Sequence, residues 1–352
     1  MKSSVLQKLT VIIISYNRHE LLIRAIKYWS NFDIKVVIID GSDVRLNNSY
    51  LNYKNIRYVH DQRSLDERLL NSFNYIDTEF MILACDDEFY LPSALSTCIN
   101  FLSTEPSFSC CGGRAVGFRT KEKKIFGIRQ YPQLRGLCLD HDSATDRIFK
   151  HFSDYVPAHF YSVIRANKWK IICLYVFQKK NSFLYSSELQ LEFLTVLSGK
   201  SKIISELMWM RNNEISRIDS RSDIPIEEWW YDKKNENEKI SFLQNMKKAC
   251  NDLSTNQNSI LNEETISNLF EVHIKRILEY NNKNLFRKML NLVPSKIGIK
   301  LLKFVKKCLS IAAREKSLTE EINILEAEGV SVNSEELKKI ISILQSPKND
   351  IS

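Results

Sequence analysis

Apolar runs rich in β-branched residues alternate with segments of helical periodicity along the first hundred residues. Such runs are typical of buried strands, and the segments between them repeat apolar side chains at spacings of three and four. Strands are expected at 10–15, 34–39, 56–60 and 79–85, and helices at 19–29 and 64–75. Because these strands are almost entirely apolar, they predict a parallel sheet covered by helices on both faces.

The pattern changes further along the chain. Helices are expected at 91–103 and 182–197 and strands at 108–118, 158–165 and 202–210, whereas 119–145 is expected to be irregular and basic. After about residue 222, polar spacers separate helical stretches, and valine and threonine become rare. We therefore expect an α/β domain over 1–222 and an α-helical region over 223–352.

Composition narrows the class of protein. The chain has 352 residues, of which 44% are hydrophobic and 26% charged, as in an ordinary globular protein. No apolar run approaches the ~20 residues that span a bilayer, and the N-terminal run VIII is too short for a secretion signal. The eight cysteines form no paired C-x-x-C array, so neither a zinc site nor a disulfide framework is indicated. Scattered thiols favour a cytoplasmic protein.

The net charge of +8 suits an anionic small molecule, a membrane surface or a nucleic acid. Nucleic acid is disfavoured because the basic residues are dispersed and form no recognition motif.

Polar residues follow three of the expected strands: SYNR at 15–18, DGS at 40–42 and DDE at 86–88. In parallel sheets, ligands bind beyond the carboxyl ends of the strands. The three polar segments therefore predict a ligand site at one edge of the sheet.

The acids Asp86, Asp87 and Glu88 are the strongest chemical signal. Adjacent carboxylates repel one another unless a cation or hydrogen-bond donors neutralise them. A hard divalent ion, whose other ligands are substrate phosphates and water, would do so. The alternative is a solvated acidic turn, which the position directly after an apolar strand disfavours.

The other two strand ends leave two interpretations open. Asp40 either accepts from a ribose hydroxyl or a base N–H, or belongs to a simple Asp-Gly-Ser turn. Tyr16 and Arg18 offer a stacking face and a phosphate partner. Alternatively, Tyr16 only packs on the sheet edge and Asn17 caps the following helix.

The segments TVIIISYNR, VVIIDGSD and ERLLNSFNYIDTEFMILACDDEF resemble the GT-A fold, family-2-like bacterial glycosyltransferases, and the resemblance covers roughly 8–215. It implies a Rossmann-like mixed sheet with helices on both faces, a nucleotide-binding half at about 8–105 and an acceptor half at about 106–222. It implies nucleotide or donor contacts at Tyr16, Arg18, Asp40, Arg68, Asn71, Asp86, Asp87 and Arg211. It also implies a divalent cation, Mn²⁺ or Mg²⁺, held at the equivalent of the DXD motif by Asp86, Asp87 and Glu88.

This sequence departs from the group's pattern at two places. The third acid is Glu88, where Asp is commoner. In many relatives, the base that deprotonates the acceptor is the Asp of a Glu-Asp pair at the start of a late helix, whereas SSELQLEF has Leu189 after Glu188. Glu188 is therefore the first candidate for the base, and Glu192, one turn further on, is the second. The alternative for Glu188 is a carboxylate that merely favours a helix N-terminus. His159 and Arg165 are expected to contact the acceptor or the diphosphate, unless His159 is a structural histidine.

The resemblance implies a metal-dependent, inverting transferase that moves a sugar from a nucleoside-diphosphate sugar to a growing surface glycan of the capsule or lipopolysaccharide type. Two alternatives stay open: transfer of another nucleotide-activated group, such as a polyol phosphate, and a catalytically silent nucleotide-binding scaffold. The acceptor would be a glycan or a lipid-linked glycan. The basic segment 285–310 either lies on the inner face of the cell membrane or packs as a helix with solvated lysines.

Overall fold

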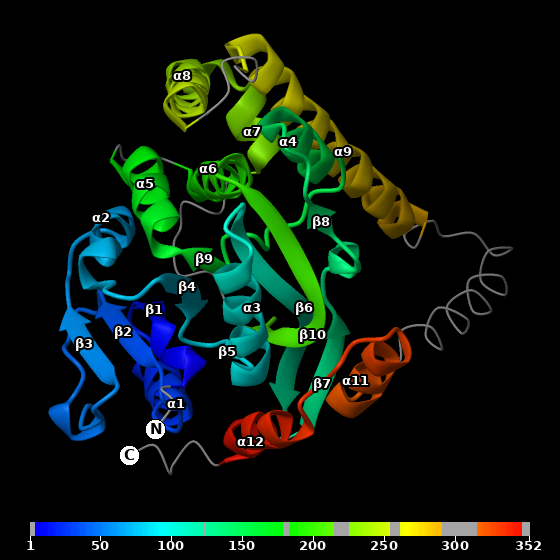
Figure 1. Cartoon of the computed structure of the whole chain (residues 1–352). Helices are drawn as coiled ribbons and strands as arrows, with labels where there is room; N and C mark the ends of the chain where they lie inside the picture. The colour runs from blue at the N-terminus through cyan, green and yellow to red at the C-terminus, as the bar shows by residue number, and fades with distance from the viewer. Residues whose placement is uncertain are drawn as a thin grey trace, which may run out of the picture.

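The computed structural model describes residues 4–122, 124–178, 183–214, 225–253, 261–290 and 315–346. Within these ranges ten strands form one mixed sheet in the order β3-β2-β1-β4-β9-β6-β10-β5, with β7 paired to β6 and β8 to β10 (Figure 1). The strands are β1 (Leu9–Ser15), β2 (Lys35–Asp40), β3 (Ile56–His60), β4 (Phe80–Cys85), β5 (Phe89–Tyr90), β6 (Phe108–Lys121), β7 (Lys124–Arg129), β8 (Cys138–Leu139), β9 (Val163–Arg165) and β10 (Lys200–Asn212). The expected Rossmann-like mixed sheet is confirmed.

The first four strands run parallel, as their apolar sequences predict. β1 pairs with β2 on one side and with β4 on the other, and β2 pairs with β3. Every residue of β1 is buried, which explains why its sequence is apolar on both faces. The short strand β9 then joins β4 to β6 in antiparallel pairing, so the whole sheet is mixed.

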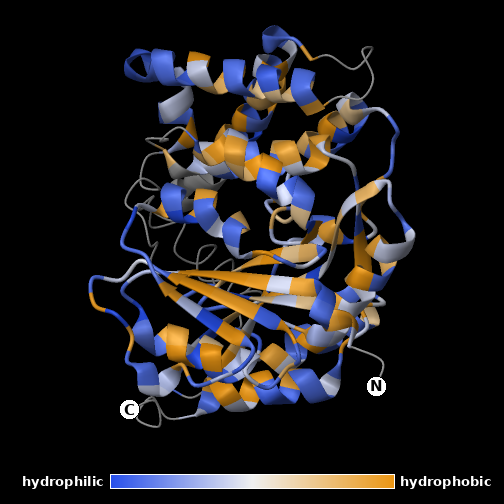
Figure 2. Ribbon diagram, turned by 60° about the vertical axis from the view of Figure 1, so that its left-hand side comes forward, coloured by the Kyte–Doolittle hydropathy of each residue, from blue (hydrophilic) through white to orange (hydrophobic). Residues whose placement is uncertain are grey.

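Helices cover both faces of the sheet, and Figure 2 shows the strands between two groups of helices. On one face, Val11 and Ile13 of β1 pack in a first core layer with α1, α3, α11 and α12. On the other face, Ile12 and Ile14 pack in a second core layer with α2 and α4 to α9. The helices are α1 (His19–Trp29), α2 (Leu65–Asn71), α3 (Pro92–Thr104), α4 (Ala144–Ser153), α5 (Ala166–Phe177), α6 (Leu184–Leu197), α7 (Ile226–Tyr231), α8 (Glu236–Leu253), α9 (Glu263–Leu290), α11 (Leu318–Ala327) and α12 (Ser334–Gln345).

The helices that follow residue 224 divide between these two layers. α7, α8 and α9 contribute to the second core layer, whereas α11 and α12 contribute to the first. Glu336 of α12 accepts hydrogen bonds from the backbone N–H and hydroxyl of Ser93, 3.0 and 2.7 Å away, at the first turn of α3. The domain boundary near residue 222 stays a prediction. The basic segment 285–310 lies outside the residues whose side chains the structure describes.

The structure corrects the expectation that 119–145 is irregular. β6 continues to Lys121 and turns into β7, which α11 covers. A backbone bridge joins Phe126 of β7 to Ser317, the residue before α11. The hairpin was missed because β7, KIFGIR, mixes basic and apolar residues and is only partly buried. Two other elements are shorter than expected. Only Val163–Arg165 of the stretch 158–165 forms a strand, and α2 ends at Asn71, followed by a 3₁₀ turn.

Among the residues that the structure describes, no helix combines the length and the apolar character needed to cross a bilayer.

Candidate functional site

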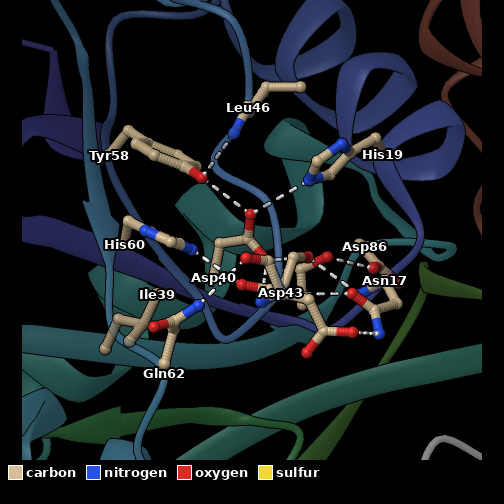
Figure 3. A network of polar contacts seen from close by, with 12 residues as sticks. Asn17, His19, Ile39, Asp40, Asp43, Leu46, Tyr58, His60, Gln62 and Asp86 are labelled. Carbon is tan, nitrogen blue, oxygen red and sulfur yellow. Dashed lines mark hydrogen bonds and ion pairs between the residues drawn. The ribbon is translucent and has the colours of Figure 1, made fainter.

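The carboxyl ends of β1, β2 and β4 meet at one edge of the sheet. In the parallel register, Ser15 of β1 lies beside Asp40 of β2, and Ile14 lies beside Cys85 of β4. The segments SYNR, DGS and DDE therefore converge, as the sequence predicts. Figure 3 shows side chains from all three segments in one polar network.

Arg18 neutralises part of the acidic triplet. Its guanidinium forms an ion pair with Asp86, and its Nη1 lies 3.3 Å from Asp87 Oδ2. Asp86 also accepts a 2.7 Å hydrogen bond from the Ser15 hydroxyl. Burial raises the pKa of Asp86 to about 6, although Arg18 opposes the shift. Asp86 is thus committed to partners within the protein.

Glu88 lies on the other side of the triplet. It accepts a 2.9 Å hydrogen bond from Trp209 Nε1, and its Oε1 lies 3.8 Å from Nε of Arg211. Burial, followed by the charge of Asp87, raises the pKa of Glu88 to about 8. A buried carboxylate with a raised pKa gains from any further cation placed beside it.

A divalent cation fits Asp87 and Glu88 better than Asp86. One ligand atom from each of Cys85, Asp87 and Glu88 lies within 4.8 Å of the others. The two carboxylates are hard oxygen ligands of the kind that Mg²⁺ and Mn²⁺ prefer, whereas burial keeps the Cys85 thiol protonated by raising its pKa. The assignment of a metal to the acidic triplet stays a prediction.

Asp40 is buried, and residues of the protein already bind both of its oxygens. The hydroxyl of Tyr58 donates to Oδ2 at 2.7 Å, and the Nε2 of His19 lies 3.5 Å from the same oxygen. The backbone N–H of Ser42 donates to Oδ1 at 3.0 Å. Figure 3 shows Tyr58 and His19 approaching Asp40 from opposite sides. Asp40 therefore fixes the turn and the two side chains around it.

Tyr16 and Asn17, directly after β1, lie at the protein surface. Asn17 has a positive φ of 51°, a conformation that Asn tolerates better than most residues. Its side-chain amide donates to Asp43 Oδ2 at 2.9 Å and accepts from the backbone N–H of Asp43 at 3.0 Å. Asn17 therefore does not cap the next helix. Tyr16 is 37% exposed and is not buried against the sheet edge. Its ring is therefore available for stacking.

Arg68 supports the site from beneath. This buried side chain donates from Nη1 to the backbone oxygen of Ser15 at 2.6 Å and packs against Gly41, where an added Cβ would lie 2.4 Å from the guanidinium carbon. Asn71 instead donates to the backbone of its own helix at Glu67. The structure brings Arg68 under the converging strand ends but gives Asn71 no contact with them.

We expect Arg68→Met to lower the free energy of unfolding by about 1–3 kcal/mol, because it removes a buried charge-assisted hydrogen bond to β1. Urea unfolding of the two proteins measures this difference. Arg63→Met is the control, since the half-exposed Arg63 pairs with Asp61 near the surface, a type of pair worth about 0–1 kcal/mol. Equal unfolding midpoints for the two variants would contradict the supporting role of Arg68.

Glu188 lies in the second turn of α6, which begins at Leu184. Stabilisation by the helix dipole falls off within the first turn, so it does not explain this carboxylate. Burial raises the pKa of Tyr161, and the charges of Glu188 and Glu88 add to the shift. The Tyr161 hydroxyl therefore lies within electrostatic range of both Glu88 and Glu188.

Glu192 is fully buried and holds a turn together. Its Oε1 accepts backbone N–H bonds from His159 and Phe160 at 2.7 and 3.2 Å. Its Oε2 lies 2.9 Å from His151 Nε2 and 3.0 Å from His159 Nδ1. Burial alone would raise the pKa of Glu192, but the two imidazoles lower it to about 2. This geometry favours an anchoring role over that of an acceptor base, and it makes His159 a buried partner of Glu192.

Arg165 lies at the opposite end of β4 from the acids, because it pairs with Phe80, the first residue of that strand. Its guanidinium donates to the backbone oxygens of Leu102, Glu105 and Phe108. The structure therefore does not bring Arg165 to the strand ends where the other candidates meet.

Sequence reasoning missed an aromatic cluster beside Glu88, formed by Tyr131, Tyr161 and Trp209. The ring of Trp209 lies 5.6 Å from that of Tyr131 and 4.8 Å from that of Tyr161. Arg211 binds the hydroxyl of Tyr131 and lies over both the Tyr131 and Trp209 rings. Tyr131 has a positive φ of 47°, which costs about 1–3 kcal/mol in a non-glycine residue and often marks functional sites.

Arg24 was missed as well. Its Nη2 donates to the backbone oxygen of Asp87 at 3.2 Å, and its guanidinium lies over the Phe89 ring. A basic residue between Ile23 and Ala25, on the apolar face of a helix, is a signal that could have found it.

No protein-family model matches the sequence, and no curated protein matches it. Among solved structures, the crystal structure of S. aureus TarS 1-349 in complex with UDP-GlcNAc has a TM-score of 0.49 and 12% identity, over 71% of this chain and 68% of that chain. The complex of S. aureus TarS 1-349 with UDP has a TM-score of 0.46 and 11% identity, over 71% of this chain and 67% of that chain. Similarity at this level does not identify a reaction.

Proposed function

We propose that this protein is a glycosyltransferase that uses a nucleoside-diphosphate sugar. The observation that supports the proposal is the convergence of Asp87 and Glu88 with Arg18 and Arg211 at the carboxyl ends of parallel strands. A diphosphate carries the negative charge that such cations bind, and the carboxylates suit a divalent ion between them and the phosphates.

The nucleoside would lie above β1 and β2, where the Tyr16 ring is exposed. Asp40 shapes this position through Tyr58 and the turn at Ser42 rather than through a free carboxylate. The diphosphate would lie between Arg18 and Arg211, whose side chains flank the acidic triplet.

Asp87 and Glu88 would hold Mn²⁺ or Mg²⁺, and this ion would supply Lewis-acid neutralisation of the diphosphate leaving group. Arg18 and Arg211 contribute to the same neutralisation from the protein side. Asp86, which is bound to Arg18 and Ser15, fixes the orientation of that guanidinium.

Glu188 is the proposed base. It would take the proton of an acceptor hydroxyl as that oxygen forms a bond to the anomeric carbon. The bond from this carbon to the diphosphate oxygen breaks in the same displacement, and its electron pair leaves with the nucleoside diphosphate. One displacement of this kind inverts the anomeric configuration. The proposed acceptor is a growing surface glycan, which would approach past Tyr131 and Tyr161.

Donor binding and turnover test the proposal separately. Purified protein is screened by thermal unfolding against nucleoside diphosphates and their sugars, with and without Mn²⁺ or Mg²⁺. A ligand at about 100 times its dissociation constant stabilises by ~2.7 kcal/mol. Product masses from the binding donor then distinguish sugar transfer from transfer of a phosphate-bearing group.

Glu188→Gln should bind the donor as the wild type does and lose most turnover, whereas the exposed helical carboxylate variant Glu236→Gln should keep both. Nucleotide binding without turnover would favour the catalytically silent scaffold, whereas absence of a shift with every nucleotide, in a folded protein, would contradict the proposed donor site. Full turnover by Glu188→Gln would refute the assignment of the base.

A further inference from the structure

The buried cluster of His151, His159 and Glu192 lies apart from the acidic triplet and has no part in the proposed transfer. His151 comes from α4, Glu192 from α6, and His159 from the segment between α4 and β9. All three side chains are at most 1% exposed. One ligand atom from each lies within 4.8 Å of the others.

We propose that this cluster binds a transition-metal ion, with Zn²⁺ as the ion that its two imidazoles and one carboxylate suit best. Zinc bonds to histidine nitrogen and carboxylate oxygen are about 2.0–2.2 Å long, so neighbouring ligand atoms in a tetrahedral site lie about 3.3 Å apart. The observed separations of 2.9 and 3.0 Å from Oε2 to the two ring nitrogens are close to that spacing.

The two imidazoles approach Glu192 Oε2 differently: His159 Nδ1 is aligned for a hydrogen bond with that oxygen, whereas the orientation of His151 suits an ion. Its Nε2 lies 2.9 Å from the carboxylate, yet neither ring nitrogen forms an aligned hydrogen bond. Two atoms that bind a common ion approach each other in this way, because the nitrogen lone pair points beside the oxygen and toward the ion. A buried imidazole without an aligned hydrogen bond otherwise calls for an explanation, since buried polar groups are nearly always paired.

The surroundings also suit an ion. Glu192 Oε1 is held by the backbone N–H groups of His159 and Phe160, which orient the carboxylate as outer-shell partners do in metal sites. The ring of Tyr155 packs beside the cluster, 5.4 Å from that of His151.

An ion here would link α4 to α6 and fix the turn that leads to Tyr161. It would therefore stabilise the fold beside the proposed site without touching the donor. This role does not depend on the proposed function.

Metal analysis and cobalt spectroscopy of the full chain test the proposal. Wild-type protein should retain about one equivalent of Zn²⁺ after gel filtration in metal-free buffer. After chelation, added Co²⁺ should give intense visible bands, because a four-coordinate site with nitrogen ligands absorbs far more strongly than a six-coordinate site of oxygen ligands.

Three variants show whether the ion lies in the histidine cluster or at the acidic triplet. The bands should vanish in His151→Gln and Glu192→Gln and persist in Asp87→Asn, with circular dichroism as the check on folding. Should the His151 variant fail to fold, His159→Gln takes its place. Folded wild-type protein that retains no Zn²⁺ and gives only weak cobalt bands would overturn the proposal. So would bands that Asp87→Asn removes and His151→Gln keeps.

Discussion

Asp87→Asn should lower the proposed sugar transfer by about a thousandfold while the protein stays folded. Asp87 is one of the two carboxylates proposed to hold the divalent cation. Its loss should cost about 4 kcal/mol of transition-state stabilisation. Fold is expected to survive because Asp87 makes only a 3.3 Å contact with Arg18, whereas Asp86 carries the shorter ion pair. The measurement is the rate of donor turnover beside the thermal unfolding temperature.

Glu79→Gln is the matched control for Asp87→Asn. Glu79 directly precedes β4, at the end opposite the acids, and its half-exposed side chain pairs with Lys8. Its replacement should leave turnover within a factor of two, since such pairs contribute little. Asp86→Asn should lower both turnover and stability, because it leaves Arg18 short of a buried partner. Turnover by Asp87→Asn within tenfold of the wild type would remove Asp87 from the site.

Leu325→Ala should lower the free energy of unfolding by about 2–5 kcal/mol, the range for a fully buried leucine. Leu325 is 1% exposed on α11, which packs on β6 and β7 within the first core layer. Chemical denaturation measures the loss. The effect is large because the C-terminal helices complete this layer.

The neighbouring exposed residue provides the comparison for Leu325→Ala. Glu326→Ala should change stability by no more than about 0.5 kcal/mol, as is usual for surface positions. If both variants unfold at the same denaturant concentration, α11 does not pack on the sheet as described.

The core of the fold could be predicted because its strands are buried on both faces. The central residues of β1, β2 and β4 are apolar, and a parallel arrangement brings the polar residues at their carboxyl ends together without further information. The hairpin of β6 and β7 could not be predicted in this way. β7 is half-exposed, and α11, the helix that covers it, does not begin until Leu318.

The position of the candidate residues at the strand ends was predicted better than the pairing among them. The sequence placed Arg18, Asp40 and the acids at one edge, but not the ion pair of Arg18 with Asp86 or the closure of Asp40 by Tyr58. Glu192 illustrates the reason. It lies one helical turn from Glu188, a spacing that suits a catalytic role. In the structure its carboxylate pairs with His151 and His159, and no local sequence pattern connects these histidines to it.

The packing of α11 and α12 on the first core layer has a consequence for how the chain is synthesised. Glu336 and Ser93, which hydrogen-bond to each other, are 243 residues apart. The apolar face formed early by α1 and α3 therefore stays uncovered while the ribosome adds most of the remaining chain. Contacts of such long range form slowly, and exposed apolar surface favours aggregation. The nascent protein should accordingly depend on a chaperone until residues 315–346 emerge.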